Sequence, residues 1–218
     1  MNLALNTKII EPENKNEIDN AIILLHGYGG DGQDISTLAL SWKRFLTKTV
    51  FLCPDAKEFC SVNPSGFQWF DLSKDDPKYI LQEVKKTEAL LFKFIDEIKK
   101  KYNLQNSKIV ICGFSQGCMM SINLGLVSKE NFNCIVGFSG KIIDKQDLEK
   151  RKLSNTKMLL IHGDIDDIVA PSSLLEANDF LVRNKIEVKT KIITACGHHI
   201  SVEASSYALN YIKDNLKL

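Results

Sequence analysis

The chain has 218 residues, of which 44% are hydrophobic and 25% are charged, and its formal net charge is +1. These values are ordinary for a globular protein, and the length predicts one domain over residues 1–218. The net charge is small, and no apolar run approaches the roughly 20 residues that span a bilayer. We therefore expect no nucleic-acid partner and no integral membrane segment.

The N-terminal sequence and the cysteines indicate in which cellular compartment the protein is expected. The first residues lack the basic start, apolar core and small-residue cleavage site of a secretory signal. The six cysteines are scattered and form no CxxC pair, and Cys112 and Cys134 lie in apolar runs, where cysteine acts as a small buried hydrophobe. A reduced, cytoplasmic protein is therefore expected.

A glycine-rich loop follows the first apolar run, which predicts a strand over residues 21–25. Its sequence, HGYGGDG at residues 26–32, allows unusual backbone angles and close approach to a ligand. One interpretation is a phosphate-binding loop, but the Lys-Ser/Thr ending of a P-loop and the Rossmann glycine spacing are missing. The other is a loop that supplies one backbone N–H to an oxyanion hole, which a serine motif further along the chain favours.

The next segments predict a helix over residues 33–46, with an apolar face made of Leu38, Trp42, Phe45 and Leu46. A short strand over 50–53 follows. Residues 54–77 then show no clear periodicity but contain Phe59, Phe67, Trp69 and Phe70. A loop of that length inside a compact domain is often functional. Its aromatic side chains either wall a substrate pocket or anchor the loop to the core.

A serine motif stands between a predicted strand and a predicted helix. An amphipathic helix begins at Pro77, and the apolar run 109–112 after it precedes GFSQG at residues 113–117 and a helix-length segment over 118–126. Strand, G-x-S-x-G and helix form the nucleophile elbow of the α/β-hydrolases. The tight turn exposes the serine hydroxyl, and the helix directs free N–H groups and its positive dipole end towards it. Ser115 is therefore a candidate nucleophile.

The rest of the chain continues the alternation of strands and helices. Strands are expected over residues 134–138, 157–161 and 186–193, and helices over 171–184 and 201–218. Alternating strands and helices predict an α/β fold with a mostly parallel, doubly wound sheet and helices on both faces.

A serine nucleophile needs a histidine base and a carboxylate, and in α/β-hydrolases these follow the serine in the order acid, then histidine. HGDIDD at residues 162–167 and CGHH at 196–199 both come directly after predicted strands. Two adjacent histidines cannot both point at Ser115, so His198 and His199 are alternatives. His26 and His162 precede glycines at strand ends and are interpreted as loop-structuring residues. The histidine pair lacks H-E-x-x-H or a Cys/His ligand set, so no metal is expected.

Five motifs resemble the acyl-protein thioesterase/carboxylesterase (lysophospholipase-like) family of small α/β-hydrolases. They are, in order, LLHGYGGDGQD, GFQWFDL, GFSQG, HGDIDDIVAP and GHHIS. The similarity extends from about Ile22 to the final helix. It implies an α/β-hydrolase fold and a Ser-Asp-His triad that cleaves carboxylic esters or thioesters of acyl chains without a cofactor. Small members of this family often pair, so a homodimer is one expected assembly.

The resemblance also implies roles for individual residues. The family nucleophile falls on Ser115 and its acid on Asp166, although an alanine before the proline of that motif leaves Asp167 as an alternative. The family histidine follows a glycine, which selects His198 over His199.

The family oxyanion hole uses two backbone N–H groups, which here belong to Tyr28 and Gln116. Leucine is common in the family at the position of Tyr28, and glycine at that of Cys118, which departs from the pattern without an expected role for the thiol. The aromatic residues expected at the substrate pocket are Phe67, Trp69 and Phe70.

We therefore expect a serine hydrolase that forms an acyl-enzyme on esters or thioesters of small molecules, lysolipids or acylated proteins. A serine peptidase or another hydrolase on the same fold is an alternative, because fold and triad do not determine the substrate. A non-catalytic ligand-binding relative is the alternative from a different class.

Overall fold

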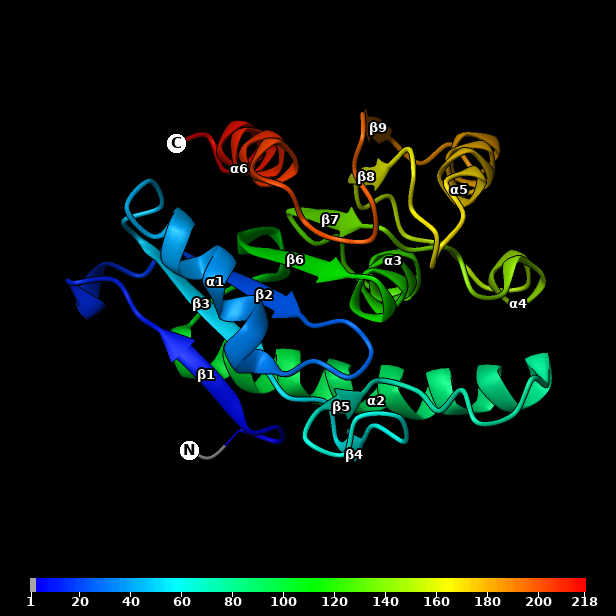
Figure 1. Ribbon diagram of the computed structural model, residues 1–218. Coiled ribbons are helices and arrows are strands. Elements are labelled where there is room, and N and C mark those ends of the chain that lie inside the picture. The colour runs from blue at the N-terminus through cyan, green and yellow to red at the C-terminus, as the bar shows by residue number, and fades with distance from the viewer. Residues whose placement is uncertain (1–2) are drawn as a thin grey trace.

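A mostly parallel sheet forms the centre of the molecule, which the computed structural model describes over residues 3–218. Its strands are β1 (Thr7–Ile10), β2 (Asn20–Leu25), β3 (Thr49–Pro54), β6 (Ile109–Phe114), β7 (Cys134–Phe138), β8 (Met158–Gly163) and β9 (Val188–Ile193). They lie in the order β1-β3-β2-β6-β7-β8-β9 (Figure 1). The edge strand β1 runs antiparallel to β3, and the other neighbours are parallel.

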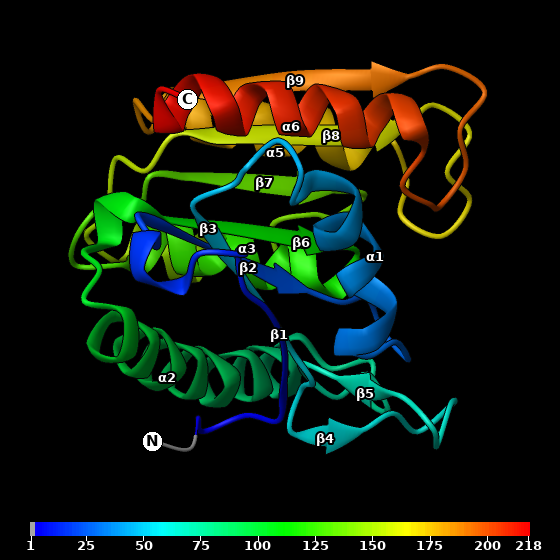
Figure 2. The same cartoon turned by 90° about the vertical axis from the view of Figure 1, so that its left-hand side faces the viewer.

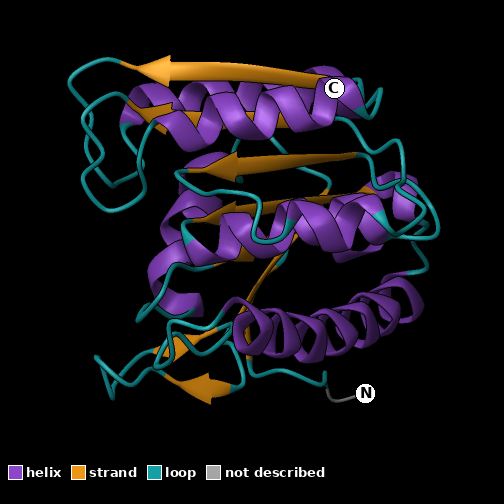
Figure 3. Cartoon of the chain, turned by 90° about the vertical axis from the view of Figure 1, so that its right-hand side faces the viewer, coloured by secondary structure: helices purple, strands orange, loops and turns teal. Residues whose placement is uncertain are grey.

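Helices cover both faces of this sheet. They are α1 (Gly32–Trp42), α2 (Pro77–Tyr102), α3 (Gln116–Val127), α4 (Lys145–Glu149), α5 (Ser172–Arg183) and α6 (Val202–Leu216), and short 3₁₀ turns cover Lys15–Glu17 and Asn106–Lys108. α1 and α6 lie on one face, whereas α2, α3 and α5 lie on the other (Figures 2 and 3). Each face buries its own hydrophobic cluster. The expected doubly wound α/β fold is confirmed.

Burial on both faces explains the uninterrupted apolar runs of the central strands. Every residue of β2, β3, β7 and β8 is buried. Such strands are typical of a parallel sheet between two helical layers. The edge strand β9 is different, because only Ile193 is fully buried and Lys189 is exposed. Lysine on an edge strand discourages pairing with another sheet.

The helix predicted over residues 33–46 is too long, because α1 ends at Trp42. The next residues form tight turns instead, in which the Phe45 N–H donates to the Trp42 carbonyl (2.9 Å) and the Leu46 N–H to the Lys43 carbonyl (3.3 Å). These turns bury Leu46 but leave Phe45 exposed. The apolar pattern therefore identified Leu38 and Trp42 on the buried face, but it was wrong about Phe45 and about the end of the helix.

Three short strands and one short helix were not predicted. β1 is short and only partly buried, and the hairpin of β4 (Glu58–Phe59) and β5 (Phe67–Gln68) lies within the aromatic loop. α4 has a single buried residue, Leu148. Each of these elements is too short for a hydrophobic period to be recognised.

The start of α2 follows the sequence signal closely. The Asp76 carboxylate accepts the Lys78 N–H at 2.9 Å, and Pro77 takes the first helical position. A capping carboxylate satisfies one of the free N–H groups of a helix, and proline has none to satisfy. Within residues 3–218, no helix is both long and apolar enough to cross a membrane.

Candidate active site

The serine motif forms a sharp turn between β6 and α3. Ser115 has φ 52° and ψ −115°, a conformation that side-chain-bearing residues rarely adopt. Glycine is required on both sides: a Cβ at Gly113 would lie 2.1 Å from the Gly117 carbonyl oxygen. A Cβ at Gly117 would lie 2.2 Å from the Leu25 carbonyl oxygen. The turn therefore depends on close backbone contacts that only glycine permits.

Cys118 lies next to this turn and fills space left by two other glycines. A Cβ at Gly137 or Gly140 would lie 2.5 or 2.4 Å from its Sγ atom. Burial raises the pKa of the Cys118 thiol, so the thiol stays protonated. The side chain of Cys118 therefore has a packing role beside the turn.

His198 links Ser115 to Asp166. The His198 Nε2 atom lies 2.9 Å from Ser115 Oγ, and Nδ1 lies 2.8 Å from Asp166 Oδ2. The three residues follow β6, β8 and β9, whose carboxyl ends meet at one edge of the sheet (Figure 1). The two alternatives do not join them. Asp167 is exposed, and the ring of His199 lies beside Cys196, with 3.7 Å between Nε2 and Sγ.

Asp166 is held as an ionised hydrogen-bond acceptor. Its Oδ1 atom accepts the N–H groups of Ile168 (3.0 Å) and Val169 (2.9 Å). Burial acts to raise the pKa of Asp166, but the hydrogen bonds from His198, Val169 and Ile168 outweigh it and hold the pKa below its ordinary value. An ionised Asp166 assigns the proton to His198 Nδ1, which leaves Nε2 free to accept the Ser115 hydroxyl proton.

His162 contacts the loop that carries Asp166. Its Nε2–H donates to the Val169 carbonyl at 2.8 Å, and Nε2 lies 3.3 Å from Asp166 Oδ2. The side chain is buried. These contacts agree with a loop-structuring residue, and they add proximity to Asp166, which the sequence alone did not indicate.

The Tyr28 and Gln116 amides flank Ser115. A Cβ at Gly27 would lie 3.4 Å from Ser115 Cβ, so the glycine-rich loop packs directly against the serine. Gln116 is the first residue of α3. In the part of the chain that the structure describes, neither amide donates to a protein acceptor. Both are therefore free for a ligand beside Ser115.

A cavity of about 540 Å³ opens beside Ser115 and Gln116. Its apolar wall comes from separate parts of the chain, namely Phe70, Leu72, Ile80, Met119, Ile143 and Ile168. Asp75, Lys141 and Asp144 also line it. Leu72 and Ile168 are 45% and 69% exposed, so apolar surface continues outwards from the cavity. Across residues 3–218, no group of three His, Cys, Asp or Glu side chains is arranged to hold a metal ion.

Comparisons with known proteins place this chain in a family. The family model described as Phospholipase/Carboxylesterase matches residues 5–216. The chain belongs to the phospholipase/carboxylesterase family. It is 28% identical to acyl-protein thioesterase 1 of Yarrowia lipolytica over 90% of this chain and 92% of that protein. It is 26% identical to acyl-protein thioesterase 1 of Schizosaccharomyces pombe, over 87% and 86%. The crystal structure of esterase PE8 superposes with a TM-score of 0.91 and 30% identity, over 96% of this chain and 98% of that one.

In this phospholipase/carboxylesterase family member, the aromatic loop over residues 54–77 is hydrogen-bonded to the serine turn. The Gln116 side chain accepts the Trp69 N–H and donates to the Phe70 carbonyl, both at 2.7 Å. The Trp69 ring donates to the His26 carbonyl at 2.8 Å, and Thr87 donates to the Trp69 carbonyl. The side chain of Gln116 thus clamps the loop, a role that sequence reasoning missed.

The three aromatic residues expected at the substrate pocket have different surroundings. Phe70 lines the cavity beside Ser115. Trp69 is buried and anchors the loop, which is the alternative interpretation. Phe67 stacks on Phe59 with ring centroids 5.1 Å apart and does not line that cavity.

His26 is buried in a site that fits only its neutral form. Its Nδ1–H donates to the Gly27 carbonyl (2.7 Å), and its Nε2 accepts the Ala56 N–H (3.0 Å). Protonation of Nε2 would place two N–H groups against each other. Burial lowers the pKa of His26 below its ordinary value, despite the bond to Gly27 and the nearby carboxylates of Asp55 and Asp31. His26 therefore orders the glycine-rich loop as an uncharged residue.

We expect this burial to make stability fall as the pH falls below about 6.5, the ordinary pKa of histidine. In that range the unfolded chain binds a proton on His26 that the folded chain excludes, at a cost of up to about 1.4 kcal/mol per pH unit. In urea unfolding at pH 7.5, 6.5 and 5.5, His26→Gln should lose less stability on acidification than the wild type does. Equal slopes for His26→Gln and wild type would contradict the neutral assignment.

Proposed function

We propose that this carboxylic-ester hydrolase cleaves esters or thioesters of acyl chains through an acyl-enzyme on Ser115. The observation that carries the proposal is the chain of hydrogen bonds from Asp166 through His198 to Ser115, with the serine in a strained turn. Serine is a weak nucleophile unless a base removes its proton, and this arrangement places a base within 2.9 Å of the hydroxyl.

The first half of the reaction forms the acyl-enzyme. His198 Nε2 accepts the Ser115 proton while Oγ attacks the acyl carbonyl carbon. The imidazolium is stabilised by the buried Asp166 carboxylate. The amides of Tyr28 and Gln116 stabilise the oxyanion, which is worth about 3 kcal/mol per donor in sites of this kind. The C–O or C–S bond then breaks, and His198 returns the proton to the leaving group.

The second half hydrolyses the acyl-enzyme. A water molecule gives its proton to the same Nε2 atom and attacks the acyl carbon, and Ser115 leaves with that proton. The acyl chain occupies the cavity of about 540 Å³, whose apolar wall favours a hydrocarbon. Because apolar side chains continue to the exposed Leu72 and Ile168, we expect chains of medium length or longer to bind best.

A fluorophosphonate probe and a series of p-nitrophenyl esters from acetyl to palmitoyl test the proposal. The probe should label one serine, which peptide mass spectrometry should identify as Ser115. In the ester series, kcat/KM should rise with chain length until the cavity is filled. A labelled serine elsewhere, or no label and no hydrolysis at any chain length, would contradict the proposal. Hydrolysis of acetyl ester alone would contradict only the expected chain length.

A further inference from the structure

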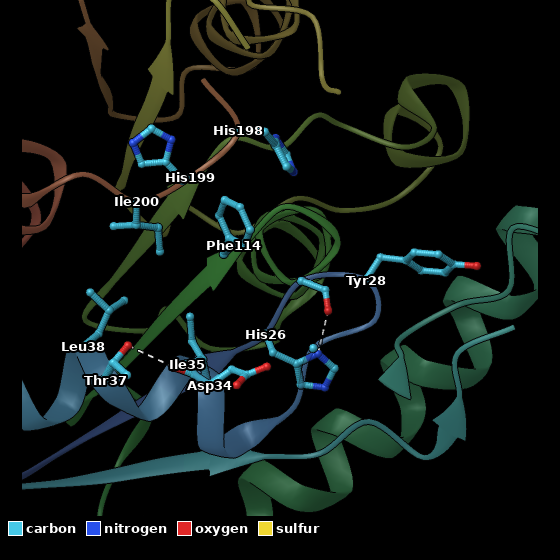
Figure 4. A pocket seen from close by; sticks show the side chains of 12 residues that line it. His26, Tyr28, Asp34, Ile35, Thr37, Leu38, Phe114, His198, His199 and Ile200 are labelled. Atoms are coloured by element: carbon cyan, nitrogen blue, oxygen red, sulfur yellow. Dashed lines mark hydrogen bonds between the residues drawn. The ribbon is translucent and has the colours of Figure 1, made fainter. Parts of the chain in front are cut away.

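A second cavity, of about 330 Å³, adjoins His198 (Figure 4). It is formed by α1, the glycine-rich loop after β2, and the ends of β6 and of the β9 loop. It shares Tyr28 with the larger cavity, so the two meet at one of the proposed oxyanion donors. Its size is at the lower end of the range of small-molecule sites.

The two cavities contact different members of the catalytic group. The larger one is lined by Ser115 and not by His198, whereas the second is lined by His198 and not by Ser115. In the proposed reaction, the leaving atom must receive its proton from His198, so the leaving group lies on the His198 side. This places the acyl chain in the larger cavity and the leaving group in the second one.

One charged side chain lines the second cavity. It belongs to Asp34, in the first turn of α1; the other lining residues are apolar, uncharged or histidine. In the described part of the chain, neither a salt bridge nor a hydrogen bond reaches the Asp34 carboxylate. The hydrogen bonds of Asp34 involve its backbone, because its N–H donates to the Asp31 side chain (2.8 Å) and its carbonyl accepts the Thr37 hydroxyl (2.9 Å). Asp34 is exposed, and its carboxylate is therefore left available to a ligand in the cavity.

Apolar side chains form part of the wall of this cavity, beside His26, His198, His199 and Thr37. Figure 4 shows the side chains of α1, including Leu38 and Ile35, on one side and Phe114 with Ile200 on the other. An aromatic face and a carboxylate both attract a cation, and apolar walls suit alkyl groups on that cation. A hydrated ammonium group without alkyl substituents would gain less from such walls.

We propose that the second cavity binds leaving groups that carry an alkylated ammonium group, with Asp34 as the residue that selects them. This inference rests on the proposed function, because it assumes that His198 protonates the leaving group. It specifies the leaving-group class, which the triad and the acyl cavity leave open. Asp34 acts on binding and not on the reacting atoms, so its effect belongs in KM.

Two esters of one acyl chain test this selection. One is the choline ester, and the other is the 3,3-dimethylbutyl ester, in which carbon replaces the charged nitrogen at the same shape. The wild type should show a KM about three- to fivefold lower for the choline ester, in the range of exposed charge pairs. Asp34→Asn should raise the choline-ester KM to that of the neutral ester and leave the neutral ester within about twofold. High salt should reduce the wild-type difference, because it screens exposed charges.

The control is Asp179→Asn, which removes an exposed helix carboxylate from α5, outside both cavities. It should change neither KM. Equal losses on both esters in Asp34→Asn, with a lower melting temperature, would assign Asp34 a structural role at the start of α1 and overturn the proposal. No difference between the esters in the wild type would also overturn it.

Failure of the proposed function is distinguishable from failure of this inference. If the enzyme cleaves p-nitrophenyl esters but neither alkyl ester, tetramethylammonium should still inhibit competitively, and less so in Asp34→Asn. Absence of that inhibition would overturn the cation site while leaving ester hydrolysis intact. If no ester of any kind is cleaved, the proposed function fails and the leaving-group assignment fails with it.

Discussion

Replacement of Ser115 by alanine is expected to lower kcat for ester hydrolysis by a factor on the order of 10⁶. The loss is large because in the proposed mechanism the hydroxyl is the atom that attacks the substrate, and the neighbouring Cys118 does not replace it. Cys118 is buried, and its raised pKa keeps it as a thiol. The measurement is hydrolysis of the best p-nitrophenyl ester, together with fluorophosphonate labelling, which should vanish.

A matched control for this variant is Ser121→Ala, in the helix α3 that follows Ser115. The Ser121 hydroxyl is also buried, and it donates to the Gly117 carbonyl at 2.8 Å. The substitution therefore removes a buried hydroxyl, as Ser115→Ala does, but one that makes no contact with His198. This variant should keep kcat within about tenfold of wild type. If Ser115→Ala retained activity at that level, Ser115 would not be the nucleophile.

Replacement of Asp166 by asparagine should lower kcat by about 10⁴-fold while leaving the fold intact. The N–H groups of Ile168 and Val169 require an oxygen at their side of residue 166, which turns the new NH₂ group towards His198. His198 must then accept at Nδ1 and carry its proton on Nε2, where it cannot take the proton of Ser115. The wrong tautomer therefore disables the base.

The adjacent Asp167 provides the control, because it has the same chemistry but is exposed. Asp167→Asn should keep kcat within about twofold of wild type. Circular dichroism and melting temperature should show that Asp166→Asn is folded before its kcat is interpreted. Equal losses in the two variants would contradict the assignment of Asp166 as the acid.

The fold and the grouping of Ser115, Asp166 and His198 could be predicted from the sequence because both depend on local signals. The central strands are uninterrupted apolar runs, and glycine is required at position 113 because a Cβ there would meet the Gly117 carbonyl within the same turn. The acid and histidine follow strands, and parallel strands bring their carboxyl ends to one edge. The position of each residue directly after a predicted strand was therefore enough to predict that the three lie together.

The rest of the site depends on contacts that no local pattern records. The wall of the larger cavity combines side chains from α2, α3 and three loops, so only the tertiary structure brings Ile80, Met119 and Ile143 together. The same holds for Trp69, whose aromatic character did not reveal that its ring nitrogen bonds to the loop of His26. The strand β1 was missed because it is short, lies at the edge and is only partly buried.

The location of His198 makes activity more fragile than structure. It follows β9, and β9 is held in the sheet by β8 alone, whereas β6, which carries Ser115, is paired on both sides. Segments with fewer contacts open at lower free energy than the global unfolding of a domain. Detachment of β9 would separate the base from the nucleophile and leave both hydrophobic clusters largely in place. If His198 is the base, as proposed, we therefore expect partial denaturation to abolish hydrolysis before most of the secondary structure is lost.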